Sequence, residues 1–242
     1  MTRRGGVALV TGAGHRLGRA FAVALGARGM RVAVHYNSSS DGAKETVRMI
    51  EAAGGRAQLF QADLSDSDGP KKLIDSVKKE IGSLDVLVNS AAGMVRTPFG
   101  DVTPEEWDSI FALNLRAPFF VVQNAARVME KGSVIVNIAD LAAFETWPGY
   151  VPHAISKAGV VKMTESLAKV LAPNIRVNAI APGAVLLPED WDEAQSKRFT
   201  ATTPLEAIGK PEDAVEAMLY LIDAEYVTGE TIVVDGGRRI RK

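Results

Sequence analysis

The sequence predicts an α/β fold in which one doubly wound parallel sheet is covered by helices on both faces. Short apolar runs alternate with segments whose apolar residues recur at helical spacing, which is the pattern of repeated strand–helix units. Several runs, such as Val7–Val10, are continuous rather than alternating, as expected for strands buried on both faces. A glycine-rich turn directly follows the first run, where such folds bind phosphate groups. The chain of 242 residues fits one large domain of this kind.

The glycine-rich turn at residues 11–18 reads Thr-Gly-Ala-Gly-His-Arg-Leu-Gly. Gly12, Gly14 and Gly18 let a phosphate approach the main chain without meeting a Cβ atom. A helix expected from about residue 17 to residue 28 would direct its free N–H groups and its positive dipole end at that phosphate. By itself, such a turn is also compatible with an ordinary strand–helix connection, so its weight depends on the motifs downstream.

The second strand is expected at Arg31–Tyr36, and a polar run at residues 37–40 follows it. In dinucleotide sites an acidic residue at this strand end binds the ribose 2′-hydroxyl, and this chain has none there. Hydroxyl and amide donors, helped by His15 and Arg16 from the first turn, would suit a 2′-phosphate instead. The pattern favours NADP(H) over NAD(H), and the alternative is a solvated serine-rich loop.

A helix over residues 41–53 and a strand over 57–61 come next. The helix ends at a Gly-Gly pair, which is a stop signal. Asp63 follows the strand and has two possible roles. It could contact a bound cofactor, or it could cap a helix that begins near Ser67.

The fourth strand, over residues 84–88, ends in Asn89, which alone would suggest a turn. The helix expected over 103–129 begins with Thr-Pro-Glu-Glu, a capping box with proline at the first helical position. Asn114 lies in its middle among apolar residues. An internal hydrogen bond at a kink before Pro118 would account for this amide, and a functional role is the alternative.

The fifth strand, over residues 133–138, is followed by Asp140 at its carboxyl end. Ligands in open α/β sheets bind just outside the carboxyl ends of strands, so this acid is well placed for chemistry. The next helix opens near Pro152. His153 and Lys157 lie four residues apart in it and therefore share one face.

The sixth strand, over residues 176–181, leads into a Pro182-Gly183 turn, which could be simply a strong turn. Residues 184–208 show no clear periodicity, and a segment of this length in a compact domain is usually a functional lid. A helix over 210–224 and a last strand within 228–237 complete the chain.

These motifs resemble those of the short-chain dehydrogenase/reductase family over nearly the whole chain. The turn at 11–18 is similar to that family's cofactor turn, and residues 89–93 are similar to its Asn-Asn-Ala-Gly motif. Arg16 stands where most members have glycine, which is similar to the pteridine reductase branch. Residues 35–39 also resemble the 2′-phosphate loop of that branch. Met94 departs from it, because pteridine reductases commonly place an aromatic residue there to sandwich the pterin.

The active-site spacing resembles the family's with two substitutions. Lys157 matches the family's lysine, and Asp140 replaces its usual serine, as in pteridine reductases. His153 stands where the catalytic tyrosine is expected. Beside Lys157 we expect this imidazole to be mostly neutral at pH 7 and a poor acid unless Asp140 offsets the ammonium. Tyr150 precedes the helix and should not share the one-turn register with Lys157.

The resemblance implies a Rossmann-type sheet of about seven strands in a single NADP-binding domain over residues 1–242, with a substrate lid at 184–208. It also implies that Lys157 holds the nicotinamide ribose and that Asn114 holds a water linking this lysine to solvent. The predicted catalytic residues are Asp140, His153, Lys157 and Asn114. The predicted cofactor-binding residues are Gly12, Gly14, His15, Arg16, Leu17, Gly18, Tyr36, Asn37, Ser38, Ser39, Asp63, Leu64, Asn89, Ser90, Ala91, Lys157, Pro182 and Gly183.

Three functions fit this pattern. The first is an NADP(H)-dependent reductase that transfers hydride to a pteridine-like C=N or a carbonyl, with imine-like substrates favoured and activity rising as the pH falls toward 6. The second is a cofactor-binding homologue with impaired catalysis and a regulatory or structural role. The third, a general carbonyl or 3-oxoacyl reductase, is disfavoured by the missing tyrosine and by Asp140.

Composition narrows the partners. A formal net charge of -1 gives no electrostatic footprint for nucleic acid or an anionic membrane. The absence of cysteine excludes disulfides and thiolate metal sites, and no metal site is predicted. No uncharged run reaches the roughly 18 residues of a membrane span, and no apolar signal segment opens the sequence. We therefore expect a cytoplasmic enzyme that binds a small-molecule substrate.

A homotetramer is also expected. The helices at 103–129 and 152–171 carry apolar residues on more than one face, which indicates a subunit interface. The family pairs these same helices across a two-fold axis. The apolar residues concerned are Phe119, Phe120, Val121, Val160, Val161, Leu167 and Val170.

Overall fold

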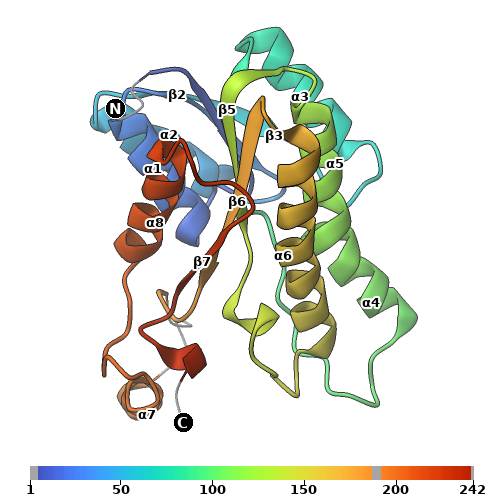
Figure 1. Cartoon of the computed structure of the whole chain (residues 1–242), viewed down its shortest axis with the longest axis vertical. Helices are drawn as coiled ribbons and strands as arrows, with labels where there is room; N and C mark the ends of the chain where they lie inside the picture. The colour runs from blue at the N-terminus through green and yellow to red at the C-terminus, as the bar shows by residue number, and fades with distance from the viewer. Residues whose placement is uncertain (1–4, 187–191, 241–242) are drawn as a thin grey trace.

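A single seven-stranded sheet organises the computed structural model, which describes residues 5–186 and 192–240 (Figure 1). All neighbouring strands run parallel, in the order β3-β2-β1-β4-β5-β6-β7. The predicted α/β fold with a doubly wound parallel sheet is confirmed. The strands are β1 Val7–Val10, β2 Arg31–Tyr36, β3 Arg56–Gln61, β4 Leu84–Asn89, β5 Met129–Ile138, β6 Ile175–Pro182 and β7 Thr231–Val234.

Helices cover both faces of the sheet (Figure 1). On one face α1, α2 and α8 pack against alternate strand residues such as Val10, and on the other α3, α5 and α6 pack against the intervening ones such as Leu9. Because successive strand residues point to opposite faces and both faces are covered, the strands read as continuous apolar runs. The helices are α1 Arg16–Ala27, α2 Ser40–Ala52, α3 Gly69–Glu80, α4 Pro104–Phe111, α5 Ala117–Ala125, α6 Val151–Leu171, α7 Glu193–Thr200 and α8 Pro211–Asp223.

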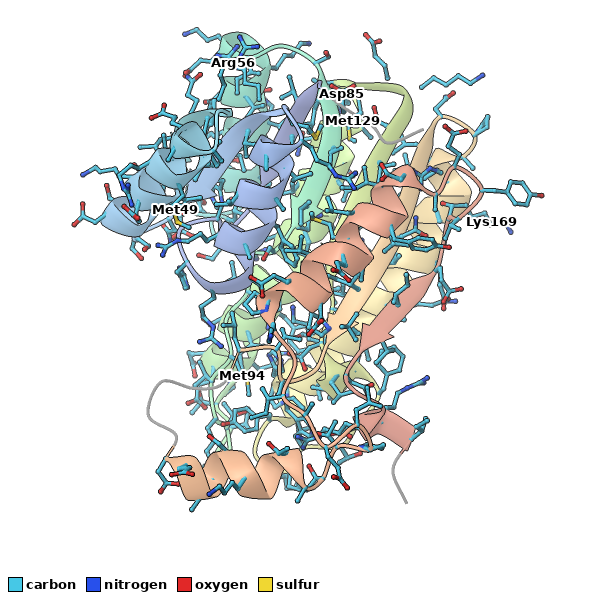
Figure 2. All side chains as sticks on the ribbon, turned by 90° about the vertical axis from the view of Figure 1, so that its left-hand side faces the viewer. Met49, Arg56, Asp85, Met94, Met129 and Lys169 are labelled. Atoms are coloured by element: carbon cyan, nitrogen blue, oxygen red, sulfur yellow. The ribbon has the colours of Figure 1, made fainter. Side chains whose placement is uncertain are left out.

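The strand order reverses between β1 and β4. From β1 the chain builds outward to β3 and then returns to β4 on the other side of β1, so the connections leave β1 and β4 in opposite directions. This opens a crevice at the carboxyl ends of the two strands. Figure 2 shows Met94, which follows β4, at the opposite end of the sheet from Arg56, Asp85 and Met129, which lie at the strands' amino ends.

The long helix predicted over 103–129 is interrupted. Its capping box is present, but α4 passes into a π-helical segment, Ala112–Arg116, before α5 begins, and α5 ends at Ala125. A π segment adds a residue to the turn, and here it carries Asn114. Strand β5 begins at Met129, earlier than the predicted 133. Its first residues include exposed, charged Glu130 and Lys131, which lack the apolar signal of a buried strand.

The segment at 184–208, which shows no clear periodicity in the sequence, contains a helix, α7. Its first residues are charged or polar and mostly exposed, so no apolar periodicity announces it. Residues 187–191 of the predicted lid lie outside the described residues. Figure 1 shows α7 beyond the carboxyl ends of the strands.

Candidate active site

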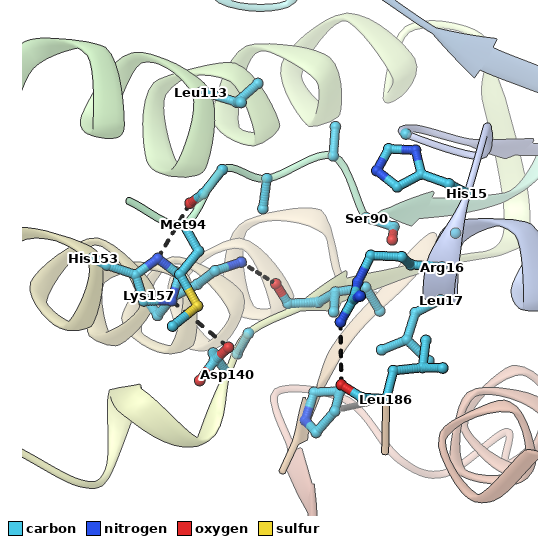
Figure 3. Close-up of a pocket in the computed structure, with 18 of the residues that line it drawn as sticks. His15, Arg16, Leu17, Ser90, Met94, Leu113, Asp140, His153, Lys157 and Leu186 are labelled. Atoms are coloured by element: carbon cyan, nitrogen blue, oxygen red, sulfur yellow. Dashed lines mark hydrogen bonds and ion pairs between the residues drawn. The ribbon is translucent and has the colours of Figure 1, made fainter. Parts of the chain in front are cut away.

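A cleft of about 990 Å³ opens at the carboxyl ends of the strands (Figure 3), a size typical of small-molecule sites. It joins the glycine-rich turn, the loop after β2, the ends of β3 to β6 and the start of α6. The predicted residues that line it are Gly12, Gly14, His15, Arg16, Leu17, Gly18, Tyr36, Asn37, Ser38, Ser39, Asp63, Leu64, Ser90, Ala91, Asp140, His153, Lys157, Pro182 and Gly183. Asn89 and Asn114 are buried behind its wall.

The glycine-rich turn is packed so closely that side chains are excluded. A Cβ atom on Gly12 would lie 2.8 Å from Cα of Ala91, and one on Gly18 would overlap the carbonyl oxygen of Gly12. Arg16 has a φ of 50°, in the left-handed region that favours glycine. Its guanidinium donates to the carbonyl of Leu186 at 3.1 Å (Figure 3).

The start of α1 suits a phosphate. His15 occupies the N-cap position, but no side chain makes a capping hydrogen bond there. The orphan N–H groups of the first helical turn therefore lack a side-chain acceptor, and residues of that turn line the cleft. The residues of this structure fit a pyrophosphate at the turn.

Asp63 is not a helix cap, which corrects one of its two predicted roles. Helix α3 begins at Gly69, six residues further on, and the carboxylate of Asp63 instead accepts hydrogen bonds from the backbone N–H and the hydroxyl of Ser65, at 2.9 and 2.6 Å. These hydrogen bonds lower the pKa of Asp63. An ionised acceptor thus stands at the edge of the cleft, next to Leu64.

Asn89 ties two strands together, as the resemblance implied. Its amide nitrogen donates to Asn137 Oδ1 at 2.9 Å, from β4 to β5. Thr11 Oγ1 holds the residues just after Asn89 by accepting from the N–H groups of Ser90 and Ala91, at 2.9 and 3.1 Å. The end of β4 is therefore fixed against the glycine-rich turn.

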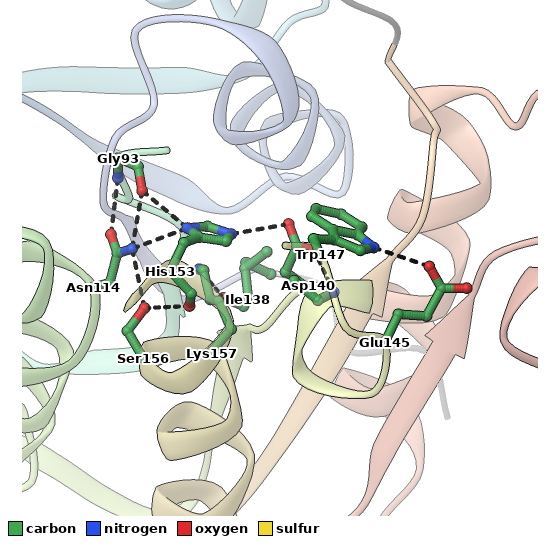
Figure 4. A network of polar contacts seen from close by, with 10 residues as sticks. Gly93, Asn114, Ile138, Asp140, Glu145, Trp147, His153, Ser156 and Lys157 are labelled. Atoms are coloured by element: carbon green, nitrogen blue, oxygen red, sulfur yellow. Dashed lines mark hydrogen bonds and ion pairs between the residues drawn. The ribbon is translucent and has the colours of Figure 1, made fainter. Parts of the chain in front are cut away.

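Lys157 lies inside the network drawn in Figure 4. Its ammonium donates to the carbonyl of Ile138, at 2.9 Å, and the side chain is buried. Burial lowers the pKa of Lys157 to about 8, against the opposing pull of the Asp140 carboxylate. The ammonium state is thus close to its titration point in the neutral to mildly alkaline range.

Asp140 and His153 face one another across the mouth of this network. Oδ2 of Asp140 lies 3.6 Å from Nε2 of His153, while its Oδ1 accepts from the N–H of Ala142 at 2.7 Å. The Asp140 side chain is 26% exposed and the His153 side chain only 2%. Nε2 of His153 is buried and makes no hydrogen bond among the described residues.

Asn114 holds His153 in a network with Gly93 and Ser156. Asn114 accepts from the N–H of Gly93 and its amide nitrogen lies within hydrogen-bond distance of the carbonyl of Gly93, of Ser156 Oγ and of Nδ1 of His153. Nδ1 of His153 also lies 3.3 Å from the carbonyl oxygen of Gly93, so this nitrogen donates to Gly93 or accepts from Asn114 according to the tautomer of the ring. In either tautomer, the ring is held with Nε2 toward Asp140.

Several cleft residues were not predicted from the sequence. Arg238 lines the cleft, and its Nε lies 3.5 Å from Oε2 of Glu145, which also accepts from Nε1 of Trp147 at 3.0 Å. Trp147 and Tyr150 line the cleft as well, with their rings edge to face at 6.3 Å. Tyr150 is the N-cap residue of α6 and so lies outside the helical register of Lys157, as expected. No sequence pattern around Arg238 predicts its place in the cleft, because only the fold brings it close to Glu145.

Comparison with known proteins identifies the family. The sequence profile described as enoyl-(acyl carrier protein) reductase matches residues 12–239. The chain is 38% identical over 244 residues to 3beta-hydroxysteroid dehydrogenase 1 of Eggerthella lenta, covering 97% of this chain and 94% of that protein. The chain belongs to the short-chain dehydrogenase/reductase family. The Synechocystis short-chain reductase named 3-oxoacyl-[acyl-carrier-protein] reductase is 35% identical over 237 residues, covering 96% of each chain.

A solved short-chain reductase shares the fold closely. The angucycline C-6 ketoreductase LanV with bound NADP superimposes with a TM-score of 0.91 at 31% identity, covering 99% of this chain and 100% of that one. Its bound cofactor agrees with the NADP(H) predicted from the sequence. Across the described ranges, 5–186 and 192–240, no helix is long and apolar enough to cross a membrane, and no cluster of acidic or imidazole side chains has the geometry of a metal site.

Proposed function

We propose that the protein is an NADPH-dependent reductase whose substrate is a flat, pterin-like heterocycle reduced at a C=N bond. The observation that carries the proposal is the single cleft that joins a phosphate-suited turn at one end to Lys157, Asp140 and His153 at the other. The ends of the cleft serve different purposes. One end holds the cofactor, and the other holds and protonates the substrate.

The cofactor end fits NADP(H). The uncapped start of α1 suits the pyrophosphate. His15, Arg16 and Ser38 offer donors to the 2′-phosphate, and residues 37–40, directly after β2, include no acid that would repel it. Lys157, buried at the other end, is placed to bind the nicotinamide ribose. When bound, NADPH supplies the hydride.

The proton comes from the Asp140–His153 pair. Both side chains line the cleft, and Asp140 is the more exposed partner, so its carboxyl group is the more accessible to a substrate. A ring nitrogen is more basic than a ketone oxygen, so a carboxyl group is a competent donor to it, directly or through water. Asn114 keeps the imidazole oriented by engaging Gly93, its hydrogen-bond partner.

The walls of the substrate end suit a flat ring. Trp147 and Tyr150 lie just before His153, and Met94 adjoins Gly93, whose carbonyl lies beside that histidine. Met94 is 53% exposed, and its thioether can lie on a ring face, though as a softer contact than an aromatic. Trp147, Tyr150 and Met94 would border a planar substrate, and none of these side chains carries a charge.

Ketone reduction is the second candidate, favoured by the names of the relatives. LanV is named a ketoreductase, and the Synechocystis relative is named a 3-oxoacyl reductase. A cofactor-binding protein with impaired catalysis is the third, favoured by the imidazole at position 153, which offers no phenolic proton. Each predicts a different assay result.

Loss of NADPH absorbance with a panel of dihydropterins, cyclic imines, ketones and 3-oxoacyl thioesters separates the three candidates. We expect turnover of the C=N substrates and little or none of simple ketones. Full turnover of a simple ketone at pH 8 would establish the second candidate. Tight NADPH binding with no turnover of any panel member would establish the third.

A further inference from the structure

His35 is a buried titratable residue outside the proposed proton path. It is the penultimate residue of β2 and is 2% exposed. Its imidazole lies between two backbone segments on either side of β2, the turn after β1 and the segment after β3. Nδ1 lies 3.1 Å from the N–H nitrogen of Gly12 in the glycine-rich turn, and Nε2 lies 3.1 Å from the carbonyl oxygen of Ala62 after β3.

The two partners determine the tautomer of His35. The N–H of Gly12 can only donate, so Nδ1 must be unprotonated, and the carbonyl of Ala62 can only accept, so Nε2 must carry the hydrogen. Burial lowers the pKa of His35 to about 4, although the Ala62 bond and the charge of Asp63 act to raise it. The ring is thus neutral, in one tautomer, throughout the neutral pH range.

The bond to Gly12 has a specific consequence for the turn. Thr11 N–H still pairs with Val88 in the adjoining strand, whereas the next N–H, that of Gly12, pairs with a side chain. Gly12 has a φ of 66° and no Cβ, so its own conformational freedom is large. The imidazole fixes its N–H, and the following residue, Ala13, donates to the carbonyl of His35 at 2.8 Å.

At its other nitrogen, His35 holds the segment that follows β3. Ala62 directly precedes Asp63 and Leu64, which line the cleft. One rigid ring on β2 therefore connects the turn after β1 to the segment after β3. We propose that His35 is a positioning residue that sets the spacing between these two segments at the cofactor end. The inference rests on the proposed function, since it assumes that NADP(H) binds there.

Two substitutions separate the two bonds. His35→Asn places an acceptor near the position of Nδ1 and keeps the Gly12 bond, while His35→Gln places a donor near the position of Nε2 and keeps the Ala62 bond. His35→Leu removes both. As a control, Asn178→Leu removes another buried amide that makes two backbone hydrogen bonds, to Val227 and from Glu230, away from the cleft.

The affinity for NADPH is measured by fluorescence titration at pH 7.5, with kcat at saturating NADPH and thermal unfolding alongside. We expect His35→Leu to weaken NADPH binding on the order of tenfold, as for loss of one to two buried hydrogen bonds. His35→Asn should recover most of that loss and His35→Gln less of it. Asn178→Leu should lower the unfolding temperature and leave the NADPH affinity within about twofold of wild type.

The outcomes distinguish this inference from the proposed function. Wild-type protein that binds neither NADPH nor NADH overturns the cofactor site and this inference with it. Wild-type protein that binds NADPH, with His35→Leu binding it equally well, overturns the inference alone. An equal loss of affinity in Asn178→Leu overturns it too, as does an ¹⁵N spectrum of wild type in which Nδ1 of His35 carries the hydrogen at pH 7.5.

Discussion

The side chains of Asp140 and His153 are unequal partners, because both line the cleft but Asp140 is 26% exposed and His153 only 2%. We expect Asp140→Ala to lower the NADPH-dependent reduction of C=N substrates by roughly 10²–10⁴-fold, the range of a lost general acid. His153→Phe should lower it less. The absorbance assay measures both. Asp75→Ala, which removes an exposed carboxylate on α3, is the control and should leave the rate unchanged. An unaffected Asp140→Ala variant would show that the proton path is wrong.

The same reaction should depend on pH. The ammonium of Lys157, whose pKa burial lowers to about 8, loses its proton as the pH rises. The rate at saturating NADPH should therefore rise as the pH falls from 9 toward 6. A profile that is flat, or that climbs toward pH 9, would contradict the assignment.

His35 makes a separate prediction about stability. Burial lowers its pKa in the folded protein to about 4, below the 6.5 of an unperturbed histidine, so the unfolded chain binds more protons between these values. Stability is present above pH 6.5 and is lost as the pH falls toward 4, by roughly 3 kcal/mol for this one group. Asp63 is the charged group that opposes the shift. Urea unfolding at pH 4.5 and 7.5 should show this loss in wild type and a smaller one in His35→Asn.

Some residues of the site can be predicted from the sequence and others cannot, and the difference has a physical reason. That Asp140, His153 and Lys157 lie in one site can be predicted, because the end of a strand and the spacing within a helix are local and regular features of the sequence. The engagement of Asn114 with Gly93, and of Arg238 with Glu145, depends on how distant segments pack. No spacing along the chain encodes those contacts.

At the scale of the element, the turn before α1 contains a strained residue. Arg16 has a φ of 50°, which costs a side-chain-bearing residue roughly 1 kcal/mol relative to glycine. Arg16→Gly should therefore raise the unfolding temperature, although the bond from Arg16 to Leu186 is lost. It should also weaken NADPH binding more than NADH binding, since the guanidinium near the expected 2′-phosphate is removed. Calorimetry and titration of both cofactors measure these effects. Tighter binding of NADH than NADPH in wild type would refute the predicted cofactor preference.

Helices and strands with strong local sequence patterns lie where they were predicted. The elements that were not predicted lack such patterns. The capping box at Thr103 and the buried strands β1, β2 and β4 lie where expected. No local pattern predicts the π segment around Asn114, which contacts Gly93, a residue 21 positions earlier in the chain. Helix α7 was not predicted because its residues are largely polar and exposed and so show no apolar periodicity.

For the whole molecule, we predict a homotetramer built on α4–α5 and α6. Phe119 and Phe120 are 40% and 38% exposed, and Val170 is 74% exposed. The chain itself does not bury these apolar side chains, as expected for residues of a subunit interface. Val121 and Val160, named with them from the sequence, are buried in the chain's own core and cannot contribute to an interface, which corrects that part of the prediction. Paired helices at a two-fold axis would bury the exposed residues.

Sedimentation at micromolar concentration tests the assembly. Wild type should sediment as a tetramer, and Phe120→Asp should give a smaller species, because a charge would be buried at the interface without a partner. Tyr220→Asp is the control, since Tyr220 is 56% exposed on α8, a helix outside the predicted interface. A monomeric wild type would refute the prediction.

Strand β7 completes the wall of the cleft that holds Pro182 and Gly183. The N–H of Gly183 donates to the carbonyl of Val234 at 2.8 Å, and Asp235 packs so closely that a Cβ on Gly183 would lie 2.9 Å from its own Cβ. Translation produces β7 after the other six strands, so a ribosome-bound chain that lacks it has the glycine-rich turn but not the strand that supports Pro182 and Gly183. We therefore expect tight cofactor binding, and the added stability that a ligand gives to the native state alone, to begin only once β7 has left the ribosome and joined the sheet.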